Sequence, residues 1–266
     1  MHDDAILRDW TAGSVEAVHD RLARTPVRRA VERIDVQVAA VVWCTTWIGG
    51  QLLFLLVAAI AGGTGDDGSL PIGTLALGIV ATWCAYLAGL WWASEHAGSG
   101  DVRADYGLAF RSTDLIGIPI GILTQLVLVP LVYVPLRAIW PDTFTEDRLQ
   151  ETAKDLVDRA DGFTVVVLVV VVVVGAPIVE ELVYRGLLQN AFATRVSETV
   201  ALLTAAAWFA VIHFRPVEYP GLFAAGLVFG ACLVSTRRLG MSIVTHAAFN
   251  ATGLLTVISA SGVDLR

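Results

Sequence analysis

The sequence predicts an all-α membrane protein, a polytopic bundle of about seven transmembrane helices within a range of about six to eight. Of its 266 residues, 56% are hydrophobic and only 16% are charged. Soluble domains carry roughly a quarter charged residues, so this composition indicates an integral membrane protein. Apolar segments also recur along almost the whole chain, which leaves no room for a sizeable soluble domain.

Seven apolar segments approach or exceed the roughly 20 residues that a helix needs to cross a bilayer. Each must be helical, because unpaired backbone groups are not tolerated in hydrocarbon. This holds even for the run of nine valines and one leucine from Val165 to Val174, whose residues favour strands in water. The predicted spans are 36–61, 71–93, 114–139, 163–192, 197–214, 220–236 and 241–260.

The connecting segments divide the chain further. Residues 1–35 are polar and rich in arginine, which predicts a cytoplasmic N-terminal segment that is either an amphipathic helix or disordered. Residues 36–140 hold three predicted transmembrane helices without a recognisable motif. Residues 141–162 form an acidic, amphipathic connecting helix, and residues 163–266 form a four-helix core.

The basic residues predict the orientation, because cytoplasmic loops are enriched in arginine and lysine. With the N-terminus inside, the first outer loop contains Asp66 and Asp67 and no basic residue. The inner connections then hold Arg103, Arg111, Arg195, Arg237 and Arg238. We therefore expect a protein of the plasma membrane with a cytoplasmic N-terminus. The net charge of −7 argues against nucleic acid as a partner, because phosphate binding needs a basic face.

Three cysteines, Cys44, Cys84 and Cys232, all lie in apolar segments. Their odd number and apolar surroundings predict small buried side chains, not a disulfide framework or a metal site.

Three charged residues interrupt the fourth predicted span. A charge at the centre of a membrane costs about 2.5–3.5 kcal/mol on insertion scales, so such residues are rare. Glu181 and Arg185 are four residues apart and share a helix face, which predicts an intrahelical ion pair. Glu180 points about a quarter turn away and shares its face with Tyr184. One interpretation is an ion pair at a helix end; the other leaves Glu180 as a carboxylate free to do chemistry.

Two histidines lie in the apolar second half of the chain. His213 ends an apolar run, with Phe209 one turn earlier, and His246 shares a helix face with Asn250. A histidine in a membrane often serves only to hydrogen-bond two helices. A glutamate beside a histidine, however, can hold and deprotonate a water molecule, and a second histidine with an amide can stabilise an oxyanion. Alternatively, a zinc ion would take its ligands from Glu180, His213 and His246.

Three short motifs resemble those of a known family. They are Glu180-Glu181-x-x-x-Arg185, Phe209-x-x-x-His213 and His246-x-x-x-Asn250. Their order and their place at apolar spans are similar to the CPBP family, the CAAX proteases and bacteriocin-processing enzymes, also called the Abi family. The resemblance covers about residues 163–258 and makes residues 163–266 a catalytic four-helix core. It implies that Glu180 and His213 activate water, that His246 and Asn250 form the oxyanion site, and that supporting roles fall on Glu181, Arg185 and Phe209.

The resulting expectation is an intramembrane endopeptidase similar to the type II CAAX prenyl protease. The resemblance favours metal-free chemistry without a cofactor, and a zinc-dependent version is one alternative. A non-catalytic membrane adaptor and a proton-coupled transporter are the others. The expected partners are the lipid bilayer and a peptide or membrane-protein substrate, with prenylated peptides and leader peptides among the candidates.

One difficulty concerns the depth of the two residues expected to share a water molecule. Straight spans place Glu180 toward the cytoplasmic side of its helix and His213 toward the outer end of the next. A kink at Pro177, or a short or tilted fifth helix, is needed to bring them together.

Overall fold

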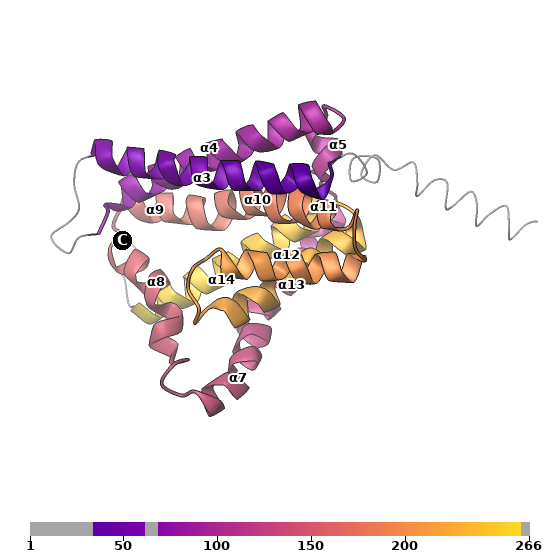
Figure 1. The fold of residues 1–266 in the computed structure, drawn as a ribbon. Coiled ribbons are helices and arrows are strands. Elements are labelled where there is room, and N and C mark those ends of the chain that lie inside the picture. The colour runs from indigo at the N-terminus through magenta and orange to yellow at the C-terminus, as the bar shows by residue number, and fades with distance from the viewer. Residues whose placement is uncertain (1–33, 62–68, 262–266) are drawn as a thin grey trace, which may run out of the picture.

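The computed structural model describes residues 34–61 and 69–261, and these residues contain helices and no strand. Among them, six helices are long and apolar enough to cross a membrane (Figure 1). They confirm the predicted polytopic helical bundle. Their bounds are Val36–Ala61 (α3), Ile72–Ala97 (α4), Ser112–Ile139, Phe163–Phe192, Tyr219–Thr236 (α13) and Leu239–Ser261 (α14). The predictions for residues 1–33 and for the turn at 62–68 lie outside the described residues.

The remaining helices are shorter. The fifth predicted span is α12 (Glu198–Val211), apolar but only 14 residues long. A five-residue helix, α5 (Val102–Tyr106), follows the second span. The predicted amphipathic connecting helix is α8 (Glu146–Asp158), which packs through Val157 against Leu168, Leu254 and Val257.

The third and fourth spans are not uniform α-helices. The third consists of η1 (Ser112–Ile116), α6 (Gly117–Leu123), the π-helical η2 (Thr124–Leu128) and α7 (Val129–Ile139). The fourth consists of α9 (Phe163–Val169), the π-helical η3 (Val170–Gly175), α10 (Ala176–Glu180), the π-helical η4 (Glu181–Gln189) and α11 (Asn190–Phe192). Pro177 in α10 lies between the two π-helical stretches. Such stretches are rare and occur often at functional sites.

The fourth span occupies the middle of the bundle. Figure 1 shows α3 and α4 along one side of α9, α10 and α11, with α12, α13 and α14 on the other side. All nine residues of η4 are buried. The main core surrounds this segment and includes Val183, Leu187, Phe209, Phe229 and Leu239. The most polar part of the fourth span is therefore also its most enclosed part.

Ion pairs between connecting segments lie at the two ends of the helical bundle. At one end, Arg195 Nη2 lies 3.5 Å from Asp35 Oδ2, and Arg237 pairs with Glu198. At the other end, Arg215 Nη2 lies 3.2 Å from Glu151 Oε2. These groups match the predicted inner and outer connections, so the alternation of the spans agrees with the arginine pattern. Which end faces the cytoplasm stays a prediction.

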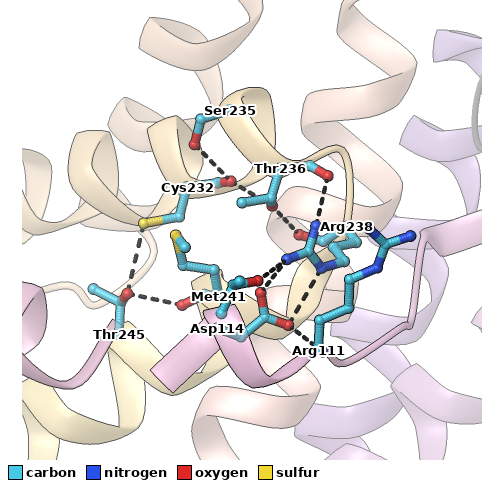
Figure 2. A network of polar contacts seen from close by, with 9 residues as sticks. Arg111, Asp114, Cys232, Ser235, Thr236, Arg238, Met241 and Thr245 are labelled. Atoms are coloured by element: carbon cyan, nitrogen blue, oxygen red, sulfur yellow. Dashed lines mark hydrogen bonds and ion pairs between the residues drawn. The ribbon is translucent and has the colours of Figure 1, made fainter. Parts of the chain in front are cut away.

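A buried polar clamp joins the third span to the last two at the predicted inner end (Figure 2). Asp114, only 1% exposed, accepts hydrogen bonds from Arg238 Nη2 at 2.6 Å and from the Arg111 backbone N–H at 2.7 Å. Arg238 also donates to Thr113 Oγ1 and to the Thr236 carbonyl. Nearby, the Cys232 thiol lies 3.5 Å from Thr245 Oγ1, between α13 and α14.

Close backbone contact holds α6 against α14. A Cβ on Gly117 would lie 2.9 Å from the Met241 carbonyl oxygen, and one on Gly121 would lie 2.3 Å from the Thr245 carbonyl oxygen. Only glycine fits at these two positions, which form a Gly-x-x-x-Gly pair of the kind that brings membrane helices together.

The predicted burial of the cysteines is right for Cys232 and wrong for Cys44 and Cys84, which are exposed. The reason is that an apolar segment of a membrane protein also covers the surface that meets lipid. An apolar sequence around a cysteine therefore does not imply that its side chain is buried.

Candidate active site

Two consecutive glutamates lie at the junction of α10 and η4. Glu180 is the last residue of α10, and Glu181 is the first of η4. Arg185 Nη1 lies 2.9 Å from Glu181 Oε1, and both side chains have 0% exposure. The predicted ion pair therefore exists, and it is buried in the bundle, not located at a helix end on the surface.

The Arg185 guanidinium is enclosed by aromatic rings. Its Cζ lies 4.6 Å from the ring centroid of Phe209 and 5.3 Å from that of Phe229. Its Nη2 donates a 3.0 Å hydrogen bond to the carbonyl of Gly226 in α13. Cation–π attraction and these hydrogen bonds offset the cost of removing the charge from water. Phe209 thus supports the buried charge as well as preceding His213.

The Glu181 carboxylate is fully engaged. Besides Arg185, it accepts hydrogen bonds from His246 Nδ1 at 2.9 Å and from Ser242 Oγ at 2.5 Å. A carboxylate that receives three donors is held in its ionised form and is poorly suited to accept a proton from water. Ser242 was missed by the sequence reasoning, although its place four residues before His246 on the same helix face was the available signal.

His246 connects the two glutamates. Its Nδ1 must carry a proton, because the ionised Glu181 carboxylate can only accept. Its Nε2 lies 3.8 Å from Glu180 Oε2, and its ring stacks on Phe229 with centroids 4.4 Å apart. The imidazole is therefore fixed in position, with its second nitrogen toward Glu180.

Glu180 differs from Glu181 in its surroundings. Its side chain is 28% exposed, whereas that of Glu181 is 0% exposed. Within the described residues, His246 Nε2 is the only basic nitrogen within 4.0 Å of its carboxylate. As the helical spacing predicts, Glu180 and Tyr184 face the same space, since both line one cavity. The carboxylate is thus available to a molecule in that cavity.

His213 lines the same cavity, whose volume is about 300 Å³. The residue follows the C-terminal end of α12, and its Nδ1 lies 2.6 Å from the Phe209 carbonyl oxygen. Because a carbonyl only accepts, Nδ1 carries the proton and Nε2 of the neutral ring keeps its lone pair. The geometry therefore leaves His213 with one nitrogen able to accept a proton.

The short α12 removes the predicted difference in depth. Its 14 residues rise about 21 Å, so the helix ends well before a full crossing. Glu180 lies 12 residues from the end of its own span at Phe192, or about 18 Å on the same measure. Both side chains consequently lie at similar depth, as their shared cavity requires.

The loop that carries His213 is tied down by polar contacts. The Tyr133 hydroxyl donates to the Val217 carbonyl at 2.9 Å and accepts from the Gly221 N–H at 3.2 Å. Arg215 Nε lies 2.6 Å from Glu218 Oε1. Burial raises the pKa of the Glu218 carboxyl, and the Arg215 charge partly opposes this increase. Non-helical backbone at membrane depth needs such partners.

Asn250 lies on α14 but does not line the cavity. Its Nδ2 donates a 2.8 Å hydrogen bond to the carbonyl of Val172 in the π-helical η3. The structure therefore brings together Glu180, Glu181, Arg185 and His246, with His213 across the cavity, and it holds the Asn250 amide on a backbone carbonyl.

Another wall of the cavity is formed by α3 and α4, two helices in which the sequence shows no motif. Their lining residues are Trp47, Gln51, Phe54, Ile79, Thr82, Trp83 and Tyr86. Sequence reasoning missed this contribution, and its signal was an isolated polar side chain, Gln51, in the middle of an apolar span.

A zinc site was the alternative use of Glu180, His213 and His246. Among residues 34–61 and 69–261, no group of three or more histidine, cysteine, aspartate or glutamate side chains is arranged to hold a metal ion. Glu181 holds Nδ1 of His246 and leaves its Nε2 as the nitrogen that a metal ion would take, so a zinc-dependent version stays an alternative prediction.

Comparison with known proteins finds one similar family. Residues 162–252 match the family described as type II CAAX prenyl endopeptidase Rce1-like. No curated protein and no solved structure matches the chain. The matched segment contains the buried Glu181–Arg185 pair, His246, and Glu180 and His213, which line the cavity. Through this segment, which is about a third of the chain, the protein is similar to the type II CAAX prenyl endopeptidase Rce1-like family.

Proposed function

We propose that this protein is an intramembrane endopeptidase in which Glu180 and His213 activate a water molecule to cleave a peptide bond. The observation that carries the proposal is the cavity lined by both side chains within the helical bundle. A half-buried carboxylate and a histidine nitrogen with a free lone pair are suited to general-base chemistry.

The reaction needs no covalent enzyme intermediate. The water oxygen attacks the carbonyl carbon of the peptide while its proton passes to Glu180. The carbonyl oxygen becomes negative and needs hydrogen-bond donors. The family resemblance assigns this role to His246 and Asn250, and Asn250 would first have to release the Val172 carbonyl to which its amide donates in this structure. The carbon–nitrogen bond then breaks, and the proton held by Glu180 or His213 passes to the leaving amine.

Glu181 and Arg185 position this machinery. Glu181 fixes the Nδ1–H form of His246, and Arg185 holds Glu181 in place. The family points to a peptide substrate in or at the membrane; a prenylated C-terminal peptide is the first candidate and a leader peptide the second. We place the protein in the plasma membrane with a cytoplasmic N-terminus.

The test uses purified full-length protein in detergent and two probes, a set of farnesylated C-terminal peptides and a pool of unmodified peptides. New peptide termini are measured by mass spectrometry. We expect the wild type to cleave members of at least one set, and Glu180→Gln or His213→Ala to lower the rate by about 10²–10⁴-fold. Glu95→Gln, which changes an exposed carboxylate at the end of α4, is the matched control and should keep full activity.

Two outcomes would contradict parts of this proposal. If the folded wild type cleaves neither set, or if Glu180→Gln retains wild-type activity, an adaptor role takes the place of catalysis. If a chelator removes the activity and zinc restores it, the metal-free chemistry is wrong while the peptidase assignment stands.

A further inference from the structure

Gln51 is a polar side chain in an unusual place. It is residue 16 of the 26-residue α3, about 22 Å from the start of that helix at Val36. The helix is otherwise mostly apolar, and the Gln51 side chain lines the cavity that contains Glu180 and His213. Within the described part of the chain, no side chain or backbone group hydrogen-bonds to its amide. The residue is exposed, and a primary amide exposed at membrane depth favours a polar partner, because unsatisfied polar groups are costly in hydrocarbon.

Several other donors near the cavity are already engaged. Thr82 Oγ1 on α4 lies 3.1 Å from the Gly50 carbonyl oxygen and 3.0 Å from that of Gly78. His246 Nδ1 is bound to Glu181, and Asn250 Nδ2 is bound to Val172. Neither His246 nor Asn250 lines the cavity. On the α3 and α4 wall, the donors left for a carbonyl oxygen include the Gln51 amide and the indole N–H groups of Trp47 and Trp83, and Gln51 is the primary amide among them.

The amide also has suitable chemistry for the reaction. Its N–H groups can donate to a carbonyl oxygen without neutralising the Glu180 carboxylate, which a lysine or arginine at this position would do. Its donor strength matters most when negative charge develops on that oxygen, since a donor positioned in a site of low dielectric acts on the transition state.

We propose that the Gln51 side-chain amide donates a hydrogen bond to the carbonyl oxygen of the peptide bond that is cleaved. This inference rests on the proposed peptidase function and extends its site to α3, outside the family-matched residues 162–252. The ligand class is an extended peptide whose scissile carbonyl lies between Gln51 and Glu180, with attacking water on the Glu180 and His213 side.

The experiment compares full-length Gln51→Met, which removes the amide at similar size, with Gln37→Met on the same helix. Gln37 is exposed near the start of α3 and does not line the cavity. The probe is the peptide that the wild type cleaves best in the two sets described above. We expect Gln51→Met to lower kcat by about 10²–10³-fold with KM little changed, and Gln37→Met to leave both constants unchanged.

A binding measurement separates catalysis from folding. An aldehyde analogue of the same peptide, which forms a tetrahedral hydrate, should bind the wild type more tightly than it binds Gln51→Met. The uncleaved peptide should bind equally to Glu180→Gln with and without Gln51→Met. An unchanged melting temperature of the purified variant in detergent would show that Gln51→Met is folded.

The outcomes distinguish this inference from the function on which it rests. If the wild type cleaves peptides and Gln51→Met cleaves them equally well, the role of Gln51 is wrong and the peptidase assignment stands. A loss of kcat in Tyr86→Phe but not in Gln51→Met would overturn the role of Gln51 and assign the donor to Tyr86. If the wild type cleaves no peptide, both proposals fail together.

Discussion

Two adjacent glutamates have opposite surroundings, and this difference decides which of them is available to a molecule in the cavity. Glu181 receives hydrogen bonds from Arg185, Ser242 and His246, whereas Glu180 faces a cavity. The distinction follows from a single step along the helix, which turns one side chain into the core and leaves the next at its edge. Phe209 adds to it by contacting Arg185, His213 and His246 with one ring.

The buried ion pair makes a prediction about stability. Arg185→Met leaves Glu181 as an uncompensated buried charge, and we expect a loss of about 3–5 kcal/mol in unfolding free energy. The double variant with Glu181→Met should be less destabilised than Arg185→Met alone, because no charge remains to be satisfied. Chemical unfolding in detergent, followed by tryptophan fluorescence, measures both.

Arg195→Met provides the matched control for that cycle. Its partner Asp35 is 3.5 Å away, and the two side chains are 59% and 38% exposed. An exposed pair contributes about 0–1 kcal/mol, so this variant should unfold like the wild type. If the double variant has a lower free energy of unfolding than Arg185→Met alone, the prediction is wrong, and the Glu181 side chain stabilises the fold even without its partner.

At the level of elements, the contact between α6 and α14 sets the position of His246. Thr245 packs against Gly117 and Gly121, and His246 is the next residue. We expect Gly121→Leu to separate the two helices, because a Cβ there would lie 2.3 Å from the Thr245 carbonyl oxygen. The variant should lose most of its peptide cleavage and melt at a lower temperature.

Gly49→Leu on α3 is the control for this substitution. A Cβ at Gly49 has nothing within 4 Å, so the added side chain meets open space. Normal activity in Gly121→Leu would mean that the alignment of α14 does not depend on this glycine contact.

The whole molecule shows which features a sequence can and cannot define. Helical spans follow from apolar length, so the predicted 36–61 and 163–192 have the observed bounds. The Glu181–Arg185 pair follows from the spacing of four residues. The two π-helical stretches in the fourth span do not, because their hydrogen-bond pattern depends on tertiary partners such as Asn250. The contribution of α3 and α4 to the cavity wall could not be predicted either, because contact between spans that are distant in sequence leaves no local sequence pattern.

The 14-residue α12 has a consequence for the surrounding lipid. Its outward side chains, Val200, Leu203, Trp208 and Val211, are exposed apolar groups that meet acyl chains. A helix of about 21 Å beside a hydrocarbon layer of about 30 Å creates a hydrophobic mismatch, which lipids relieve by compressing locally. We expect peptide cleavage in reconstituted vesicles to be faster with phosphatidylcholines of about 14 carbons per chain than with those of about 20. Equal rates across that series would show that bilayer thickness does not affect peptide cleavage by this protein. If the rates differ as expected, membrane thickness selects where in a cell this protein works best.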